Sequence, residues 1–106
     1  MVKAKKVIKV DEFPTIAEGL LGGLDTNALT FKMINKYVDE INLVQEDSIK
    51  KAIGLLWKEE GQIVEGAGAV GIAHILEAKQ KFANQDVVAI ISGGNIDNSL
   101  FKELIN

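Results

Sequence analysis

Cysteine and arginine are absent from this chain of 106 residues, and histidine occurs once, as His74. Without cysteine the chain has neither disulfides nor thiolate ligands for a metal, and one histidine cannot build a histidine-based zinc centre on its own. Without arginine it also lacks the planar group that holds carboxylates and phosphates through paired hydrogen bonds. We therefore predict no metal site, and we expect any anion to be bound by backbone amides or lysines.

Long hydrophobic runs are missing as well. No apolar stretch approaches the roughly 20 residues that span a bilayer, and the basic N-terminus lacks the apolar core and cleavage site of a secretory signal. Hydrophobic residues make up 47% of the chain and charged residues 25%, as in soluble globular proteins. The net charge of −3 and the lack of a clustered basic face argue against nucleic-acid binding. We expect a single-domain cytoplasmic protein with neither membrane nor nucleic acid among its partners.

Hydrophobic periodicity predicts helices that alternate with strands. Apolar residues at three- and four-residue spacing predict helices over 28–38, over 46–59, from about 70 to 82, and near 100–105. Strand patterns occupy 7–10, 40–44 and 86–91, with a very short extended piece at 62–65. The five consecutive apolar residues at 87–91 are typical of a strand covered on both faces. This order predicts an α/β fold with a largely parallel sheet.

A loop of Ser92, Gly93, Gly94 and Asn95 follows the last predicted strand. In open α/β sheets, ligands bind at the carboxyl ends of the strands. The two glycines allow positive φ and a close approach of the backbone to a ligand, while the serine hydroxyl and the asparagine amide can hydrogen bond to it. A plain glycine turn has the same composition. The neighbouring motifs must therefore decide between a turn and a cofactor site.

A second glycine-rich stretch follows Glu65. Gly66, Gly68 and Gly71 have the spacing of the dinucleotide-binding fingerprint. However, the piece before them is too short for a full strand, and the next strand has its only acidic residue, Asp86, at its start instead of its end. A dinucleotide-binding module is therefore the least favoured hypothesis. Glu65 precedes a predicted helix, where it either caps the helix or faces a ligand.

Four motifs of the chain resemble one family when they are taken together. They are TIAEG at 15–19, VDEINLV at 38–44, VEGAGA at 64–69 and ISGGN at 91–95. In this order they resemble the C-terminal part of pyridoxal-phosphate-dependent threonine/serine dehydratases and serine racemases, which belong to the tryptophan synthase β superfamily. The resemblance implies the fold type II architecture, three-layered with a mostly parallel sheet. Residues 1–106 would form a single partial domain, equivalent to the C-terminal part of the cofactor-binding domain.

The resemblance also implies residue roles around pyridoxal phosphate. Ser92 matches the serine whose hydroxyl hydrogen bonds to the pyridine nitrogen, and Gly19 matches the glycine beside the cofactor ring. Glu65 matches a glutamate near the same pocket. The residues that shape the loop around the cofactor are Gly93, Gly94 and Asn95. The chain departs from the family pattern at Glu18, where aspartate is usual, and at Gly66, where proline is usual.

The family's Schiff-base lysine motif and its phosphate-binding glycine run do not occur in these 106 residues. We therefore assign no catalytic residue and expect a C-terminal fragment of a threonine/serine dehydratase-like lyase, inactive alone. The complete enzyme would convert a hydroxy amino acid to a 2-oxo acid and ammonia. Expected partners are a complementing N-terminal chain or further copies in a homo-oligomer. The alternative is a non-catalytic, self-associating interaction domain. The resemblance leaves open whether the substrate is threonine, serine or another amino acid, and whether the reaction is dehydration or racemisation.

Overall fold

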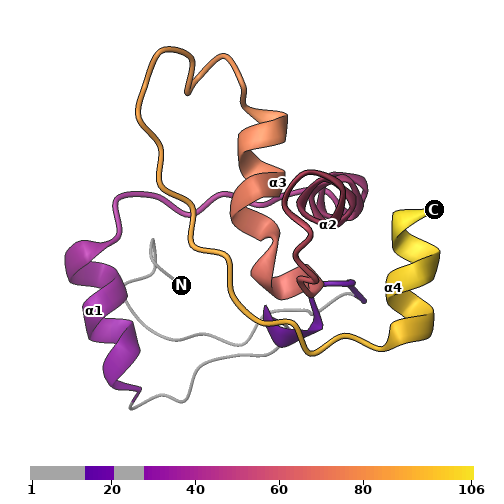
Figure 1. Cartoon of the computed structure of the whole chain (residues 1–106). Coiled ribbons are helices and arrows are strands. Elements are labelled where there is room, and N and C mark those ends of the chain that lie inside the picture. Colours follow the sequence, from indigo (N-terminus) through magenta and orange to yellow (C-terminus); the bar gives the residue numbers. More distant parts are fainter. Residues whose placement is uncertain (1–13, 21–27) are drawn as a thin grey trace.

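The computed structural model of the chain describes residues 14–20 and 28–106 (Figure 1). The elements in this part are η1 (Glu18–Leu20), α1 (Leu29–Tyr37), α2 (Glu46–Glu60), η2 (Gly66–Gly68), α3 (Val70–Glu77) and α4 (Asn98–Ile105). The helices predicted over 28–38 and 46–59 are confirmed as α1 and α2. The helix predicted to reach 82 ends at Glu77, and turns occupy most of 78–85. The strand predicted at 7–10 lies outside the described residues.

The central helix α2 builds most of the core. Glu46 and Asp47 place negative charge at its N-terminal end, where the helix dipole favours it. Gly61 ends the helix in the left-handed conformation, with φ of 64°, and its N–H returns to the last turn. One face of the helix is buried against α3 and α4. Its buried residues are Ile49, Ala52, Ile53 and Leu56.

The rest of the core comes from single residues of the surrounding elements. Ala17 precedes η1, Val64 and Ala69 flank η2, Ala73 lies in α3 and Phe101 in α4. The apolar stripe of α2 continues to Trp57, but this side chain stays partly exposed and meets the Phe101 ring edge-on, with ring centroids 5.6 Å apart. The core therefore joins α2, α3 and α4 to the two short helices η1 and η2.

The segments predicted as strands at 40–44, 62–65 and 86–91 have no strand assignment in the described residues. A strand needs a neighbour with which to exchange ladder hydrogen bonds, and residues 14–20 and 28–106 form no such ladder. The segment from α1 to α2 and the segment that leads to α4 both pass alongside α3 (Figure 1). The parallel sheet and the three layers therefore stay predictions.

Large apolar side chains of these segments and of α1 point into solvent. Leu43 and Val88 are each 92% exposed and Ile90 is 83% exposed. Helix α1 has no buried residue and packs against no other helix of the described part. We call the following residues the uncovered surface: Leu29, Met33, Tyr37, Leu43, Val88 and Ile90. Among residues 14–20 and 28–106, no helix is long and apolar enough to span a membrane.

Candidate functional site

The turn formed by Glu65 and η2 is the point at which three segments of the chain meet. The Gly68 N–H donates to the Glu65 carbonyl oxygen at 3.0 Å, and the Ala69 N–H donates to the Gly66 carbonyl oxygen at 3.1 Å. These bonds close a tight turn that leads directly into α3. We call residues 65–68 the hub, because the predicted site residues gather around it.

The Ser92 loop is hydrogen bonded to the hub on both sides. The Glu65 N–H donates to the Gly93 carbonyl oxygen at 3.0 Å, and the Ser92 N–H donates to the Gly68 carbonyl oxygen at 3.4 Å. Gly93 has φ of 74°, so the positive φ anticipated for this loop is found there. A Cβ at Gly93 would overlap the Glu65 carboxylate and lie 2.8 Å from its Cδ. The loop backbone and the Glu65 side chain are therefore in direct contact.

The segment that carries Gly19 reaches the hub from the other direction. A Cβ on Gly19 would lie 3.0 Å from the Cβ of Ala67. The Ile16 N–H donates to Glu46 Oε2 at 3.0 Å, and the Ala17 N–H donates to Thr15 Oγ1 at 3.0 Å. The segment thus forms a local turn at Thr15 and is anchored on the first residue of α2. In Figure 1 this segment and the one leading to α4 meet near the start of α3.

Residues far apart in the sequence are thus brought together. Glu65 is part of the hub, and Gly19, Ser92 and Gly93 adjoin it. A Cβ on Gly94 would lie 2.9 Å from the carbonyl oxygen of Ile63, which precedes the hub. Asn95 follows on the same loop. Gly19 and residues 92–95 are exposed and Glu65 is half-buried. The arrangement therefore offers a hydroxyl, an amide and bare glycine backbone to a ligand arriving from solvent.

Gly66 and Gly68 have a role that the sequence does not reveal. Their spacing suggests a pyrophosphate-binding turn, yet their Cα atoms face protein backbone: that of Ile16 at Gly66 and that of Ser92 at Gly68. Gly71 similarly faces the Cβ of Ala89, at 3.4 Å. These contacts disfavour the dinucleotide-binding hypothesis. The one available signal was the glycine spacing itself, which cannot distinguish a ligand from a neighbouring chain segment.

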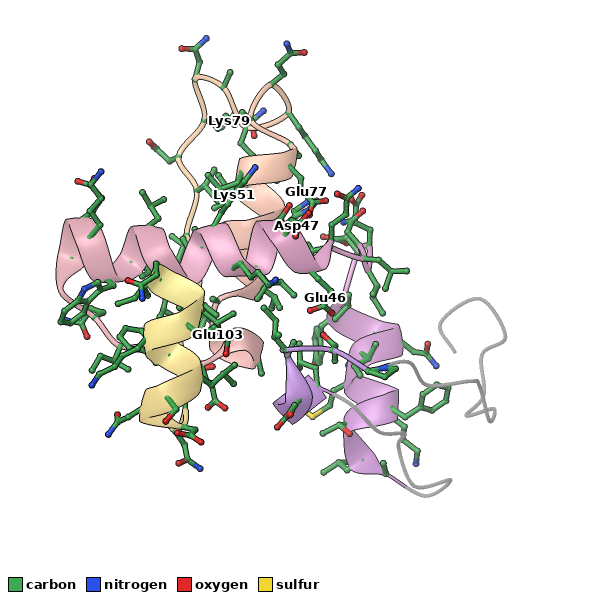
Figure 2. All side chains as sticks on the ribbon, turned by 90° about the vertical axis from the view of Figure 1, so that its right-hand side faces the viewer. Glu46, Asp47, Lys51, Glu77, Lys79 and Glu103 are labelled. Carbon is green, nitrogen blue, oxygen red and sulfur yellow. The ribbon has the colours of Figure 1, made fainter. Side chains whose placement is uncertain are left out.

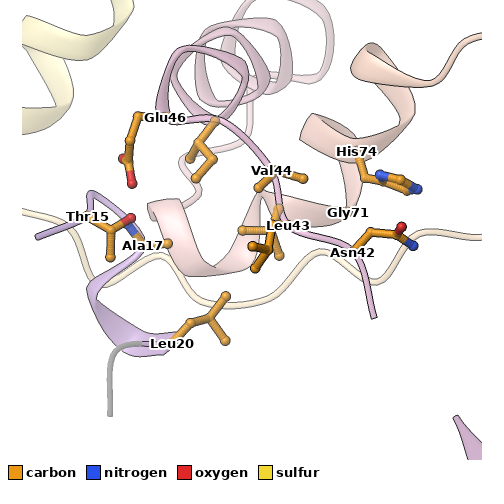
Figure 3. Close-up of a pocket in the computed structure, with 11 residues that line it drawn as sticks. Thr15, Ala17, Leu20, Asn42, Leu43, Val44, Glu46, Gly71 and His74 are labelled. Atoms are coloured by element: carbon orange, nitrogen blue, oxygen red, sulfur yellow. The ribbon is translucent and has the colours of Figure 1, made fainter. Parts of the chain in front are cut away.

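A largely apolar cavity of about 410 Å³ lies beside the hub, between η1, residues 42–44, the start of α2 and α3 (Figure 3). It is lined by Thr15, Ala17, Leu20, Asn42, Leu43, Val44, Glu46, Ile49, Val70, Gly71 and His74. None of the predicted cofactor residues lines it, although Ala17 and Leu20 flank the segment that holds Gly19. His74 also packs edge-on against the Phe82 ring, with centroids 5.5 Å apart.

Two carboxylates hold the segment that crosses this cavity. Glu40 Oε1 accepts hydrogen bonds at 2.7 Å from Lys81 Nζ and from Asn42 Nδ2. The Lys81 hydrogen bond is the main reason that the pKa of Glu40 lies below its usual value. Glu77 Oε2 accepts from the Gln45 N–H at 2.8 Å, which likewise lowers the pKa of Glu77. Glu77 lies near Asp47, by the N-terminal end of α2 (Figure 2).

Metal ligands are not gathered anywhere in the described part of the chain. Residues 14–20 and 28–106 contain no group of three or more histidine or acidic side chains that could hold a metal ion. The groups at and around the hub are the Ser92 hydroxyl, the Asn95 amide, the Glu65 carboxylate and backbone groups.

Comparisons with known proteins identify relatives along most of the chain. The family described as pyridoxal-phosphate dependent enzyme matches residues 1–93. The L-threonine ammonia-lyase of Thermotoga maritima is 40% identical over 92% of this chain and 24% of its own length. The catabolic L-threonine dehydratase of Escherichia coli K12 is 40% identical over 72% of this chain and 24% of its own length.

A solved structure shows the same relation. In the crystal structure of the serine racemase from Dictyostelium discoideum, the matching region covers 91% of this chain and 30% of the racemase chain. The TM-score is 0.75 and the sequence identity is 39%. The fold is therefore that of the corresponding part of serine racemase. The chain spans between about a quarter and a third of the length of these relatives.

Proposed function

We propose, from the premise that this chain belongs to the family of pyridoxal-phosphate dependent enzymes, that it forms the C-terminal part of a threonine/serine dehydratase-like lyase. The complete enzyme would remove ammonia from a hydroxy amino acid and release a 2-oxo acid. Relatives named threonine ammonia-lyase and threonine dehydratase support this reaction class. The observation that carries the proposal is the meeting of the Ser92 loop, Glu65 and the Gly19 segment at one turn.

The groups around the hub suit the pyridine side of pyridoxal phosphate. The Ser92 hydroxyl would hydrogen bond to the ring nitrogen, and Gly19 would leave room for the flat ring. Glu65 and the loop of Gly93, Gly94 and Asn95 would border the same pocket. When bound, pyridoxal phosphate withdraws electrons from the substrate's α-carbon. A neutral serine leaves the ring nitrogen uncharged and so limits that withdrawal. These residues would orient the ring and set its electronic state.

The other half of the pocket would come from residues outside these 106, in the same polypeptide or in a second chain. The uncovered surface supports this proposal, because Leu43, Val88 and Ile90 expose apolar area that water disfavours. We propose that residues 1–106 form a partial domain, equivalent to the C-terminal part of the cofactor-binding domain. Segments 40–44 and 86–91 would then become strands of a mostly parallel, three-layered structure. We retain the cytoplasmic location expected from the sequence as part of this proposal.

A chimera tests this function directly. The matching region of the Thermotoga maritima L-threonine ammonia-lyase is replaced by this chain, and 2-oxo acid release from threonine and from serine is measured with pyridoxal phosphate present. We expect the chimera to bind the cofactor and turn over at least one of the two substrates. We expect the purified 106-residue chain to release no 2-oxo acid and to give no adduct at one specific lysine after borohydride treatment.

Two serine variants of the chimera separate the site from general effects. Ser92→Ala removes the proposed hydrogen bond to the ring nitrogen and should weaken cofactor binding about tenfold. Ser99→Ala alters an exposed serine in α4 and should leave the affinity unchanged. A folded chimera that binds no pyridoxal phosphate, or a lone chain that turns over serine, would contradict the proposal.

A second candidate function is a non-catalytic interaction domain that associates with copies of itself. The exposure of Val88 and Ile90 favours it, because unpaired apolar segments pair readily between copies. Light scattering on the purified chain across a concentration series tests this alternative. A strict monomer at all concentrations would count against self-association and leave the lyase proposal untouched.

A further inference from the structure

Gly66 and Gly68 must be glycine because of what they touch and not because of their own backbone conformation. Among the glycines of the described residues, only Gly61 and Gly93 have positive φ. An alanine could therefore adopt the backbone angles of Gly66 or Gly68 without local strain. What a side chain would meet at these two positions is the backbone of another segment.

The backbone of Ser92 lies directly against Gly68. A Cβ at position 68 would overlap the Ser92 carbonyl oxygen and lie 2.6 Å from the Ser92 carbonyl carbon. The same glycine accepts a hydrogen bond from the Ser92 N–H. Both polar groups of the Ser92 backbone are thus in contact with one residue. Since the side chain extends from this backbone, a shift of the Ser92 backbone would also move the Ser92 hydroxyl.

The segment before Gly19 lies in the same way against Gly66. A Cβ at position 66 would overlap the Ile16 carbonyl oxygen and lie 2.7 Å from the Ile16 carbonyl carbon. The Ile16 N–H is bonded to Glu46, and the Ala17 N–H is bonded to Thr15. The contact with Thr15 is local to the segment, so the bond from Ile16 to Glu46 is the one that ties the segment to α2. The close approach at Gly66 is therefore opposed by this bond on the other side of the segment.

We propose that Gly66 and Gly68 are positioning residues that set the spacing between the Gly19 segment and the Ser92 loop. The two glycines belong to one three-residue turn, so the two segments are held a fixed distance apart. Because the interior is densely packed, a methyl group added at either glycine must displace the neighbouring segment. The proposal rests on the proposed function, since it assigns a role to the separation of two cofactor-facing segments.

Amide NMR on the full ¹⁵N-labelled chain tests the proposal without any cofactor. Gly68→Ala should shift the Ser92 and Glu65 amide signals and speed their hydrogen exchange about tenfold or more, with little change at Leu20. Gly66→Ala should shift the signals of 16–20 and leave Ser92 nearly unchanged. Gly54→Ala is the matched control, because a Cβ there has no neighbour within 4 Å, and it should alter neither segment.

The outcome stays decisive even if an alanine variant fails to fold. In the unsubstituted chain, we expect nuclear Overhauser contacts from the Gly68 α-protons to Ser92 and Gly93, and from the Gly66 α-protons to Ile16 and Ala17. Absence of both sets would overturn the proposal. So would folded Gly66→Ala and Gly68→Ala variants whose amide signals change no more than those of Gly54→Ala.

The chimera allows a further measurement, the absorbance maximum of bound pyridoxal phosphate, which a general loss of stability would not shift. Gly68→Ala should shift the absorbance maximum of the bound pyridoxal phosphate, because Ser92 then meets the ring nitrogen in a different position. Gly54→Ala should leave the maximum unchanged, and an unshifted maximum in a Gly68→Ala chimera that still binds the cofactor would contradict the positioning role. A chimera that binds no cofactor would overturn the proposed function, and with it any role of Gly66 and Gly68 in cofactor binding. The NMR contacts would still test separately whether these glycines set the spacing of the two segments.

Discussion

Two regions of this chain bury their apolar residues to very different extents. In the packed module, formed by α2, η2, α3 and α4, Ile53 is fully buried and Phe101 nearly so. On the uncovered surface, Leu43 and Val88 are almost fully exposed. Both regions have apolar residues at regular spacing, so the sequence pattern alone does not separate them. The difference lies in whether the described residues also supply the opposing surface.

The two regions also differ in the contacts that hold them in place. In the packed module, α2 ends at Gly61 in the left-handed conformation, and the core is shared among several elements. The segment between α1 and α2 is held in place by the polar contacts of Glu40 and Glu77, while the Leu43 side chain on it faces water. A segment that is held in place while its apolar side chains are exposed can bury those side chains against another surface.

The largest effect is expected from a substitution inside the packed module. Ile53→Ala leaves a cavity at the centre of α2 and should lower the free energy of unfolding by about 2–5 kcal/mol. Urea unfolding followed by circular dichroism measures this. Leu55→Ala, on the more exposed side of the same helix, should cost under about 1 kcal/mol. Equal effects of the two substitutions would mean that the packed module has no defined core.

A substitution on the uncovered surface should matter only when that surface is covered. Val88→Ser should change the stability of the isolated chain by less than about 0.5 kcal/mol. In the chimera, where the rest of the enzyme is present, it should cost about 2 kcal/mol, because a buried valine is then replaced by a polar group. Urea unfolding of both proteins provides the comparison. The same small effect in both would show that Val88 stays exposed in the complete enzyme.

A smaller gain is expected within the packed module at Gly54. This glycine lies inside α2, and a Cβ there meets open space. Gly54→Ala should therefore raise the free energy of unfolding by about 0.5–1 kcal/mol through helix propensity alone. Thermal unfolding of the purified chain measures the gain. A loss of stability would mean that the added methyl group clashes with a neighbour, contrary to the open space at this position.

The sequence predicts the helices better than the sheet, and the reason is physical. A helix such as α2 carries its hydrogen bonds, its apolar stripe and its end signals within one stretch of sequence. A strand such as 86–91 carries its apolar pattern, but its hydrogen-bond partners lie elsewhere in the chain or outside it. The prediction over 46–59 therefore succeeds on local information, whereas the predicted strands have no ladder among the described residues.

The candidate site was also predictable only in part. The four motifs contain Gly19, Glu65 and Ser92, and the structure brings these three residues to the same hub. Their roles toward a cofactor stay predictions. The contacts of Gly66 and Gly68 could not be predicted from the sequence. A glycine indicates that another group can approach the backbone closely, but it does not identify that group. Only the fold shows that Ile16 and Ser92 are the neighbours.

The smallest expected effect concerns the polar contacts that hold the segment between α1 and α2. Glu77 accepts the Gln45 N–H, and the lowered pKa of Glu77 means that the folded chain favours the charged carboxylate. The contribution of this group is therefore fully present above its ordinary pKa of 4.5 and is lost as the pH falls through the lower folded value. The same direction applies to Glu40, whose pKa is lowered by Lys81. Both side chains are solvent-exposed, so the effect is local.

An NMR titration of the Gln45 amide checks this prediction. Its shift should be constant between pH 7 and pH 5 and should change with a midpoint below 4.5, the ordinary glutamate value. Glu77→Gln keeps an oxygen that can accept the N–H but removes the titrating charge, so the change should disappear in that variant. A midpoint at or above 4.5 would show that the Gln45 contact does not stabilise the carboxylate. The segment between α1 and α2 would then be held less firmly at its α2 end than the contact between Glu77 and Gln45 suggests.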